Sequence, residues 1–223
     1  MYLPRMATIH HTTVTPTKLE LLTAWLPTRP WYQGASAPEL AKAGGFRLED
    51  PEGEVGLEFM VVTDTSGASP VTYHVPVTYR GAPLEGAAEQ ALIGTMEHGV
   101  LGKRWVYDGP RDPVLVAQLL ALLQNRSEPQ HQNLSDTSDP TVTARTTGPA
   151  LPAGLVPGDV RDVHEEPHAT TLVVGTGEAS GTLTLAVTRV LDAPAADGSR
   201  AYVTAPWTAP DTTTREGTFA ALR

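Results

Sequence analysis

The sequence predicts an α+β protein, in which a curved antiparallel sheet with packed helices is followed by a small, mostly β unit. Three observations lead to this fold class: two alternating apolar runs separated by a turn, an apolar helix that follows Asp112 and Pro113, and further β runs after a polar stretch. We therefore expect one domain at residues 7–124, a flexible linker at 125–148 and a β-rich unit at 149–223.

Composition restricts the kinds of partner. The 20 Gly and 20 Pro among 223 residues favour many turns and short elements. A formal charge of −9 argues against binding to nucleic acid or to an anionic membrane. The absence of Cys excludes disulfides and thiolate metal sites, and no apolar run reaches the roughly 20 residues that span a bilayer. We expect a cytoplasmic protein with neither nucleic acid nor membrane as partner.

The first predicted helix follows a Thr-Pro-Thr-Lys sequence at residues 15–18, which supplies a cap and a first-turn proline. Leu19, Leu22 and Leu26 then share one face, and Pro27 ends the helix. Residues 25–32 concentrate two Trp, one Arg and one Tyr between prolines. Such clusters usually anchor a helix end through buried ring area and cation–π contacts.

The next elements form a hairpin. Residues 55–62 and 71–79 are predicted strands, joined by a turn at 64–67, and a short strand candidate at 46–48 precedes them. In the second strand, alternate residues from Val71 to Tyr79 should share one face. Pro76 lacks an N–H, so this strand lies at an edge or leaves its N–H side free at that position.

Six further elements complete the prediction. Residues 87–95 are expected to form a helix and 104–107 a strand, and a second, mostly buried helix covers 112–123, with Asp112 as its cap and Pro113 in its first turn. Strands are expected at 170–175, 182–191 and 201–203.

No complete catalytic, metal or nucleotide motif is present. His164-Glu165-Glu166-Pro167-His168 matches the H-E-x-x-H zinc pattern in letters, but Pro167 would interrupt the helix that this pattern requires, so a solvated loop is favoured. The glycines at 175–181 favour a hairpin turn over a phosphate loop. His10, His11, His74 and His98 lack identifiable metal-binding partners, and we predict no catalytic residue, metal site or cofactor.

The residues that remain as candidates for binding are aromatic and charged. Trp and Tyr rings stack on sugars, and neighbouring Arg, Lys and Asp side chains hydrogen-bond to hydroxyl groups. The candidate sugar or partner surface consists of Arg29, Trp31, Tyr32, Arg104, Trp105, Tyr107 and Asp108, with Lys103 beside it. A structural role is the alternative, and it is favoured for Trp25 and Trp105.

Four motifs in order resemble the N-terminal cap of actinobacterial maltokinases. They are Trp-Leu-Pro-Thr-Arg-Pro-Trp-Tyr at 25–32, Thr-Tyr-His-Val-Pro-Val at 72–77, Ile-Gly-Thr at 93–95, and Trp-Val-Tyr-Asp-Gly at 105–109 followed by Asp112-Pro113. The resemblance covers about residues 15–125. Pro30, inserted between Arg29 and Trp31, departs from the family pattern.

The resemblance implies a link to α-glucan metabolism, because maltokinases transfer phosphate from ATP to maltose. Residues 183–191 resemble a strand of the family's first kinase lobe, with Ala186 in place of the ATP-binding Lys, and the catalytic and metal motifs are not found. We therefore expect a non-catalytic accessory or regulatory protein that docks to an enzyme of maltose, trehalose or glycogen metabolism. The alternatives are a carbohydrate-binding module that takes up maltodextrin, or a sugar kinase component, which alone would require ATP and magnesium.

Overall fold

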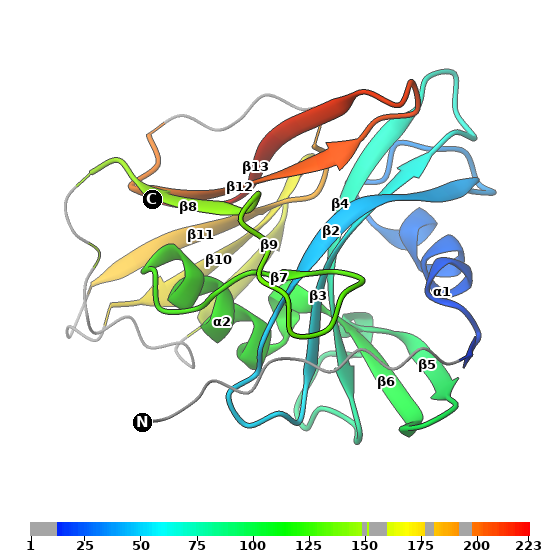
Figure 1. Cartoon of the computed structure of the whole chain (residues 1–223), viewed down its shortest axis with the longest axis horizontal. Helices are drawn as coiled ribbons and strands as arrows, with labels where there is room; N and C mark the ends of the chain where they lie inside the picture. The colour runs from blue at the N-terminus through cyan, green and yellow to red at the C-terminus, as the bar shows by residue number, and fades with distance from the viewer. Residues whose placement is uncertain (1–12, 149–150, 152–159, 177–180, 192–197) are drawn as a thin grey trace.

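The computed structural model describes residues 13–148, 151, 160–176, 181–191 and 198–223. Within them, 13 antiparallel strands form one continuous sheet, with two short α-helices packed against it (Figure 1). The strand order is β1-β5-β6-β4-β3-β2-β12-β13-β11-β10-β9, with β7 beside β2 and β8 beside β12. The prediction of an α+β protein is confirmed in this coarse sense, but packed helices were given too much weight because strands dominate.

The strands are β1 (Val14–Thr15), β2 (Leu40–Leu48), β3 (Gly56–Asp64), β4 (Val71–Arg80), β5 (Leu92–His98), β6 (Gly102–Asp108), β7 (Gln130–His131), β8 (Thr143–Thr146), β9 (Val160–Glu165), β10 (Ala169–Gly175), β11 (Thr182–Thr188), β12 (Ala201–Thr208) and β13 (Thr214–Leu222). The helices are α1 (Lys18–Trp25) and α2 (Pro113–Leu123), and three short 3-10 turns are η1 (Leu26–Thr28), η2 (Glu89–Ala91) and η3 (Gly109–Arg111).

The predicted hairpin is confirmed as β3 and β4, which pair over their whole length and separate two hydrophobic cores. Side chains alternate across a strand, so Phe59 and Val61 face the first core while Met60 and Val62 face the second. Tyr73, Val75 and Val77 of β4 line the second core, as the predicted alternation requires. The β3–β4 hairpin is therefore buried on both faces and forms the wall between the two cores.

Helix α1 covers the second core. Thr17 caps it by accepting a hydrogen bond from the backbone N–H of Glu20, whose side chain in turn accepts one from the Thr17 N–H. Leu22 and Trp25 are buried, and the chain then enters η1, with Pro27 near its start. The helix and its end before Pro27 are as predicted, but Thr17 is the cap, and Pro16 lies before the helix and not in its first turn.

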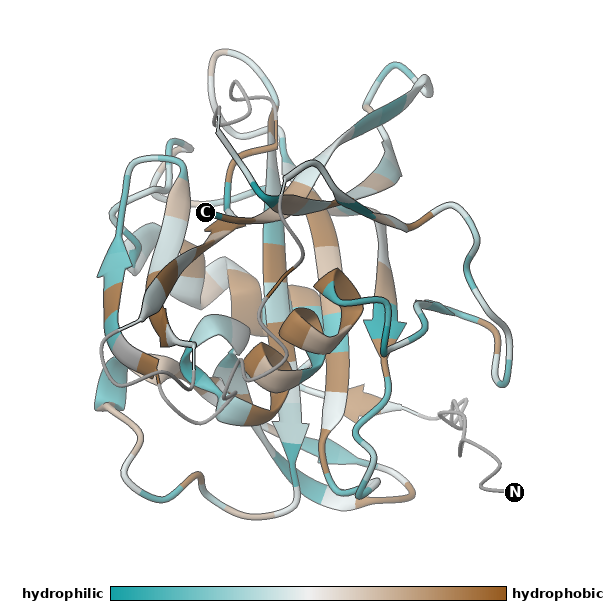
Figure 2. Ribbon diagram, turned by 90° about the vertical axis from the view of Figure 1, so that its left-hand side faces the viewer, coloured by the Kyte–Doolittle hydropathy of each residue, from teal (hydrophilic) through white to brown (hydrophobic). Residues whose placement is uncertain are grey.

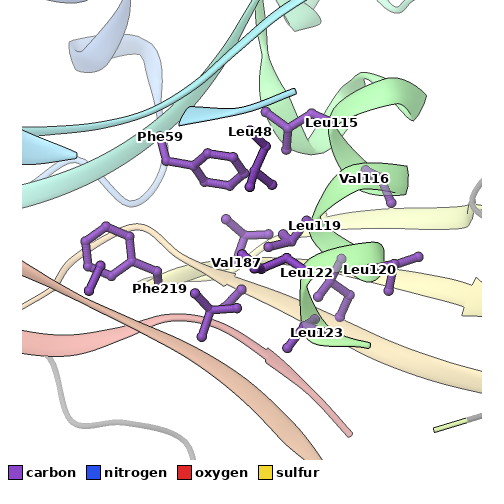
Figure 3. Packing of buried hydrophobic residues seen from close by; sticks show 14 of the residues in the cluster. Leu48, Phe59, Leu115, Val116, Leu119, Leu120, Leu122, Leu123, Val187 and Phe219 are labelled. Carbon is purple, nitrogen blue, oxygen red and sulfur yellow. The ribbon is translucent and has the colours of Figure 1, made fainter. Parts of the chain in front are cut away.

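Helix α2 fills the first core (Figure 3). Asp112 caps it and Pro113 occupies its first position, as predicted. In Figure 2 the helix that faces the viewer is mostly brown, which reflects its almost wholly apolar sequence. Its inward side chains share this core with Phe59 of β3, Val187 of β11 and Phe219 of β13 (Figure 3). The C-terminal strands thus share their core with the hairpin.

The strands of residues 40–108 and those of residues 160–222 are joined directly at two places. Trp207 of β12 pairs with Gly44 of β2, and on the other side Tyr73 of β4 forms a bridge with Val190, just after β11. The His74 N–H donates to the Arg189 carbonyl at 2.9 Å, which reinforces that bridge. The six strands β4, β3, β2, β12, β13 and β11 therefore close on themselves around the first core.

Pro76 is explained by this closure. One side of β4 pairs with residues 189–191 near Tyr73 and with β6 from Val77 onwards. Pro76 lies between these two partners, where no ladder hydrogen bond from its nitrogen is needed. The interpretation that its N–H side is free is confirmed, whereas the edge-strand alternative is wrong.

Two segments depart from prediction in detail. The helix expected at 87–95 is wrong: η2 occupies only Glu89–Ala91, and β5 then pairs with β6. Gly94 approaches Leu21 of α1 so closely that a Cβ would lie 2.7 Å from its side chain, which favours a strand packed flat under the helix. The segment predicted as a linker, 125–148, supplies β7 and β8 and buries Gln130, Gln132 and Val142. The division into domains stays a prediction.

The remaining predictions concern strands and termini. The strands at 46–48, 104–107, 170–175, 182–191 and 201–203 are found within β2, β6, β10, β11 and β12, although β11 ends at Thr188. His10, His11 and most of the predicted turn at 175–181 lie outside the described residues. Across the described part of the chain, no helix is both long enough and apolar enough to cross a membrane.

Candidate functional site

The predicted surface residues do not form one surface. Trp31, Tyr107 and Asp108 are buried, with 1, 4 and 0% of each residue exposed, whereas Arg29, Tyr32, Arg104 and Trp105 are half-buried. Trp31 and Tyr32 lie beside Tyr73 at the start of β4, while Trp105 pairs with Arg80 at its end. The structure thus divides the candidates into a buried cluster and a separate hairpin.

The buried cluster is built around Trp31. Its ring meets Trp25 edge-on at 5.8 Å and lies 5.9 Å from the ring of Tyr73. Its indole N–H donates to Glu165 Oε2 at 2.7 Å, and the Arg189 guanidinium lies over the ring at 4.9 Å. Trp31 therefore joins the chain after α1 to strands from the C-terminal half.

Arg189 and Asp108 form an ion pair at the centre of this cluster, and both side chains are wholly buried. Arg189 Nη2 donates to both Asp108 carboxylate oxygens at 2.7 Å, and its Nε donates to Thr170 Oγ1 at 2.8 Å. Burial raises the pKa of the Asp108 carboxyl above its ordinary value, although the Arg189 charge opposes this shift. We call Trp31, Asp108, Arg111, Glu165, Thr170 and Arg189 the junction network.

Glu165 completes the junction network. Its Oε1 accepts from Arg111 at 3.1 Å, and its Oε2 accepts from Thr170 at 3.1 Å as well as from Trp31. Arg29 stacks over Trp25 at 4.9 Å, and burial lowers its pKa while the charges of Asp108 and Glu165 oppose that effect. The network joins η3, β6, β9, β10 and the residue after β11. Each charged group in it has an ion-pair partner, although Arg111 Nε and Arg189 Nη1 are buried without a hydrogen bond among the described residues. This geometry fits structural anchoring.

Tyr32 occupies a separate polar contact. Its hydroxyl donates to Asp64 Oδ2 and to the Ala35 carbonyl, each at 2.6 Å. Burial and the hydrogen bond to Asp64 raise the pKa of Tyr32 to about 12. Asp64 also accepts the backbone N–H groups of Glu39 and Ser66, so this corner holds the loop before β2 against the turn after β3.

The β5–β6 hairpin carries the other candidates. Lys103 lies 5.0 Å over the ring of Trp105, and Arg104 Nη2 donates to the Leu101 carbonyl at 2.9 Å. Val100 and Leu101 at its tip are 61 and 45% exposed. Tyr107 points elsewhere: it is buried, and its hydroxyl accepts the Leu84 N–H at 2.9 Å. The hairpin thus presents apolar and cationic side chains together at the surface.

A second buried acid lies beside α1. Glu58 of β3 accepts hydrogen bonds from Lys18, from the Tyr79 hydroxyl at 2.6 Å and from Gln132 Nε2 at 2.9 Å. Burial opposes ionisation, but the charges of Lys18 and Arg47 and the hydrogen bonds lower the pKa of Glu58 to about 2. Because Gln132 belongs to the segment 125–148, this acid ties that segment to the hairpin.

The H-E-x-x-H pattern adopts no helix. His164 and Glu165 end β9, and the following residues turn into β10. His164 pairs with Asp162 at 3.0 Å, Glu165 belongs to the junction network, and His168 Nδ1 lies 3.2 Å from Gln33 Nε2. The solvated-loop interpretation is therefore wrong for Glu165, whose side chain is only 15% exposed. The described residues contain no group of three or more His, Asp or Glu side chains arranged to hold a metal ion.

Several of these residues were missed from the sequence. Thr170 carries no motif, and the H-E-x-x-H pattern gives no hint of the actual role of Glu165, which depends on Trp31 and Arg111, both more than 50 residues away along the chain. Arg189 had a usable signal: it is a lone charge near the end of an apolar strand run at 182–191, and a buried charge requires a partner. Ala186 is buried in β11 between Thr171 of β10 and Ala221 of β13.

Comparison with known proteins bears on the region around the hairpins. Residues 25–112 match the family model described as the maltokinase N-terminal cap domain. This segment begins at Trp25 and ends at Asp112, so it includes β2 to β6 and all seven candidate residues. Residues 25–112 are therefore similar to the maltokinase N-terminal cap domain family.

Proposed function

We propose that the protein is an accessory factor of maltose, trehalose or glycogen metabolism that docks to an enzyme through its β5–β6 hairpin. The observation that carries the proposal is the exposed tip of this hairpin within the segment that matches the cap family. Val100 and Leu101 are both more than one third exposed, and Lys103 and Arg104 follow them in β6, with Glu97 of β5 opposite Lys103. Exposed apolar side chains beside charges are typical of protein interaction sites.

The charged residues beside the hairpin tip indicate what kind of partner surface would fit it. The whole chain carries a formal charge of −9, so two cationic residues beside an apolar tip favour a local partner patch that is both apolar and acidic. Lys103 is held over the Trp105 ring and Arg104 is bonded to the Leu101 carbonyl, which limits the motion of the tip before binding. Limiting this motion lowers the entropic cost of docking.

The test starts in the native cytoplasm, where we also propose that the protein works. The tagged chain is cross-linked and purified, and any enzyme of maltose, trehalose or α-glucan metabolism that is recovered is expressed and titrated in purified form. We expect Val100→Ser combined with Leu101→Ser to weaken that binding at least tenfold. Leu134→Ser, at another exposed leucine in a different loop, is the matched control and should change nothing.

Two outcomes would contradict the proposal. One is a purified enzyme that binds the hairpin variant as tightly as the natural sequence. The other is the recovery, reproducibly and in purified form, of partners without any role in glucan or disaccharide metabolism.

A further inference from the structure

The tip of the β5–β6 hairpin is a turn of three residues. His98 at the end of β5 pairs with Gly102 at the start of β6, so residues 99–101 connect the two strands. Gly102 has a φ angle of +67°, the left-handed conformation with which three-residue hairpin loops commonly close. The turn therefore has a defined backbone, and it presents the exposed side chains of Val100 and Leu101.

Both of these apolar residues are bonded through their backbones to the side chain of His98. The N–H of Val100 donates to His98 Nδ1 at 3.3 Å, and the N–H of Leu101 donates to the same atom at 3.1 Å. A ring nitrogen of histidine accepts a hydrogen bond only while it carries no hydrogen itself. In this arrangement the His98 imidazole is therefore neutral, with its hydrogen on Nε2.

Two further hydrogen bonds hold the tip, and neither involves a group that titrates near neutral pH. The Gly99 N–H donates to the Thr13 carbonyl at 3.1 Å, and Arg104 Nη2 donates to the Leu101 carbonyl at 2.9 Å. Backbone amides and arginine keep their hydrogens near neutrality. Histidine, in contrast, changes its charge between about pH 5 and pH 8. Of these contacts, only the two that His98 accepts respond to pH in that range.

The charged groups beside His98 on its own hairpin are Arg104, Glu97 and Lys103. Met96 pairs with Arg104, and side chains two residues apart share one face of a strand, so Arg104 lies on the face of His98. Glu97 and Lys103 pair with each other on the opposite face. The Arg104 charge therefore opposes protonation of His98, and the Glu97 charge favours it, with Lys103 placed to offset part of the Glu97 charge.

The other elements beside β5 are β1 and α1. Strand β1 consists of Val14 and Thr15, which carry no charge. The charged residues of α1 are Lys18, which is paired with Glu58, and Glu20, which accepts from the N–H of its own helix cap. Both charged groups of α1 thus have partners other than His98, and Arg104 and Glu97 are the described charges that bear most directly on it.

We propose that His98 is a pH-sensitive switch of the docking site, an inference that rests on the function proposed for the hairpin. Neutral His98 holds the backbones of Val100 and Leu101 in one arrangement before the partner arrives. On acidification a proton binds to Nδ1, which then meets two N–H groups with a hydrogen of its own, so both hydrogen bonds break and the turn is released. Docking must then order the tip again, and the entropic cost weakens binding.

The first test is NMR of the full chain and needs no partner. Long-range proton–nitrogen correlation at pH 8 reports which ring nitrogen carries the hydrogen, and we expect Nε2 for His98. Between pH 8 and pH 5, the amide signals of Val100 and Leu101 should shift with the same midpoint as the His98 ring. A hydrogen on Nδ1 at pH 8, or tip amides that do not follow the ring, would overturn the proposal.

Two variants separate the switch from general effects of pH. His98→Asn keeps a side-chain oxygen that can accept from both N–H groups but does not titrate, so the tip amides should lose their pH dependence. His131→Asn is the matched control, because His131 Nδ1 also accepts a backbone N–H, that of Asn133 at 3.1 Å, in a different loop. This variant should leave the titration of the tip unchanged.

The second test measures docking to the enzyme recovered with the tagged chain, at high salt so that the charge gained by His98 is screened. The Kd of the natural chain should be about three- to tenfold higher at pH 5.5 than at pH 7.5, whereas His98→Asn should bind nearly equally at both. The same pH dependence in both chains would overturn the switch and leave docking intact. If no such enzyme binds the hairpin, the proposed function fails, and the NMR titration still decides whether His98 controls the tip.

Discussion

Replacing Arg189 with Met tests whether the junction network holds the two halves of the chain together. The guanidinium lies wholly inside the protein and donates two hydrogen bonds to Asp108 and one to Thr170. Met fills a similar volume without a charge. The variant would leave the Asp108 carboxyl buried, without its cationic partner, beside Glu165.

Removing one partner of a buried ion pair typically costs about 3 to 5 kcal/mol of unfolding free energy. Arg189 should lie toward the upper end of this range because both partners are 0% exposed and Thr170 also loses a donor. Combining Arg189→Met with Asp108→Asn removes both charges, so the double variant should be less destabilised than Arg189→Met alone. Much of the loss in the single variant thus belongs to the unpaired acid.

The assay is urea unfolding at pH 7.5, followed by tryptophan fluorescence and by circular dichroism. Arg145→Met, at an exposed position of β8, is the control and should stay within about 0.5 kcal/mol of the natural sequence. A loss below about 1 kcal/mol for Arg189→Met would refute the reasoning, because such a value is typical of exposed ion pairs. A double variant less stable than Arg189→Met would refute the assignment of the loss to the unpaired acid.

Three further predictions concern pH, the hairpin and catalysis. Burial lowers the pKa of His74 to about 3, so below pH 6.5 the unfolded chain takes up a proton that the folded chain does not. The unfolding free energy should therefore fall between pH 7 and pH 5, and this fall should be smaller in His74→Phe. Trp105→Ala should cost only about 1 to 2 kcal/mol by urea unfolding, below the 3 to 5 of a fully buried ring, and a larger loss would show that the hairpin is core. With ATP, magnesium and maltose, the purified protein should form no maltose 1-phosphate above background, because Ala186 offers no cation to the phosphates of ATP. Turnover that survives the removal of contaminating kinase would contradict this prediction.

The sequence was sufficient where the deciding forces are local. Asp112 with Pro113 places the start of α2 because its cap hydrogen bond spans only two residues. The cap of α1, Thr17 with Glu20, is equally local, although the proline expected in its first turn lies before the helix. The alternation in β4 likewise gave the face that lines the second core. These elements would be recognisable in any fold that offers an apolar surface to cover.

The sequence failed where packing against distant residues decides. Residues 87–95 are rich in helix formers, yet β5 forms there because β6 and β1 offer it two partner strands and Gly94 lets it pack under α1. The polar segment 125–148 has little to bury by its own composition. It is held by Gln132 on Glu58 and by two short strand pairings, none of which has a local pattern.

The candidate site residues show the same difference between what local patterns predict and what distant contacts decide. Trp31 and Asp108 belong to the predicted surface because aromatic rings stack on sugars and charged side chains hydrogen-bond to hydroxyl groups. They are buried because Arg189 and Glu165, some 80 and 130 residues away along the chain, place opposite charge and a hydrogen-bond acceptor against them. A charged residue within an apolar strand is therefore the feature that distinguishes anchors from binding residues here: Arg189 indicates that a carboxylate must be buried beside β11, and Asp108 meets that requirement. Among the described contacts, Trp105 has no hydrogen bond or buried charge from a distant part of the chain, and the tip of its hairpin is exposed. The β5–β6 hairpin, and not the region around Trp31, is therefore the part of the predicted surface that we propose for docking.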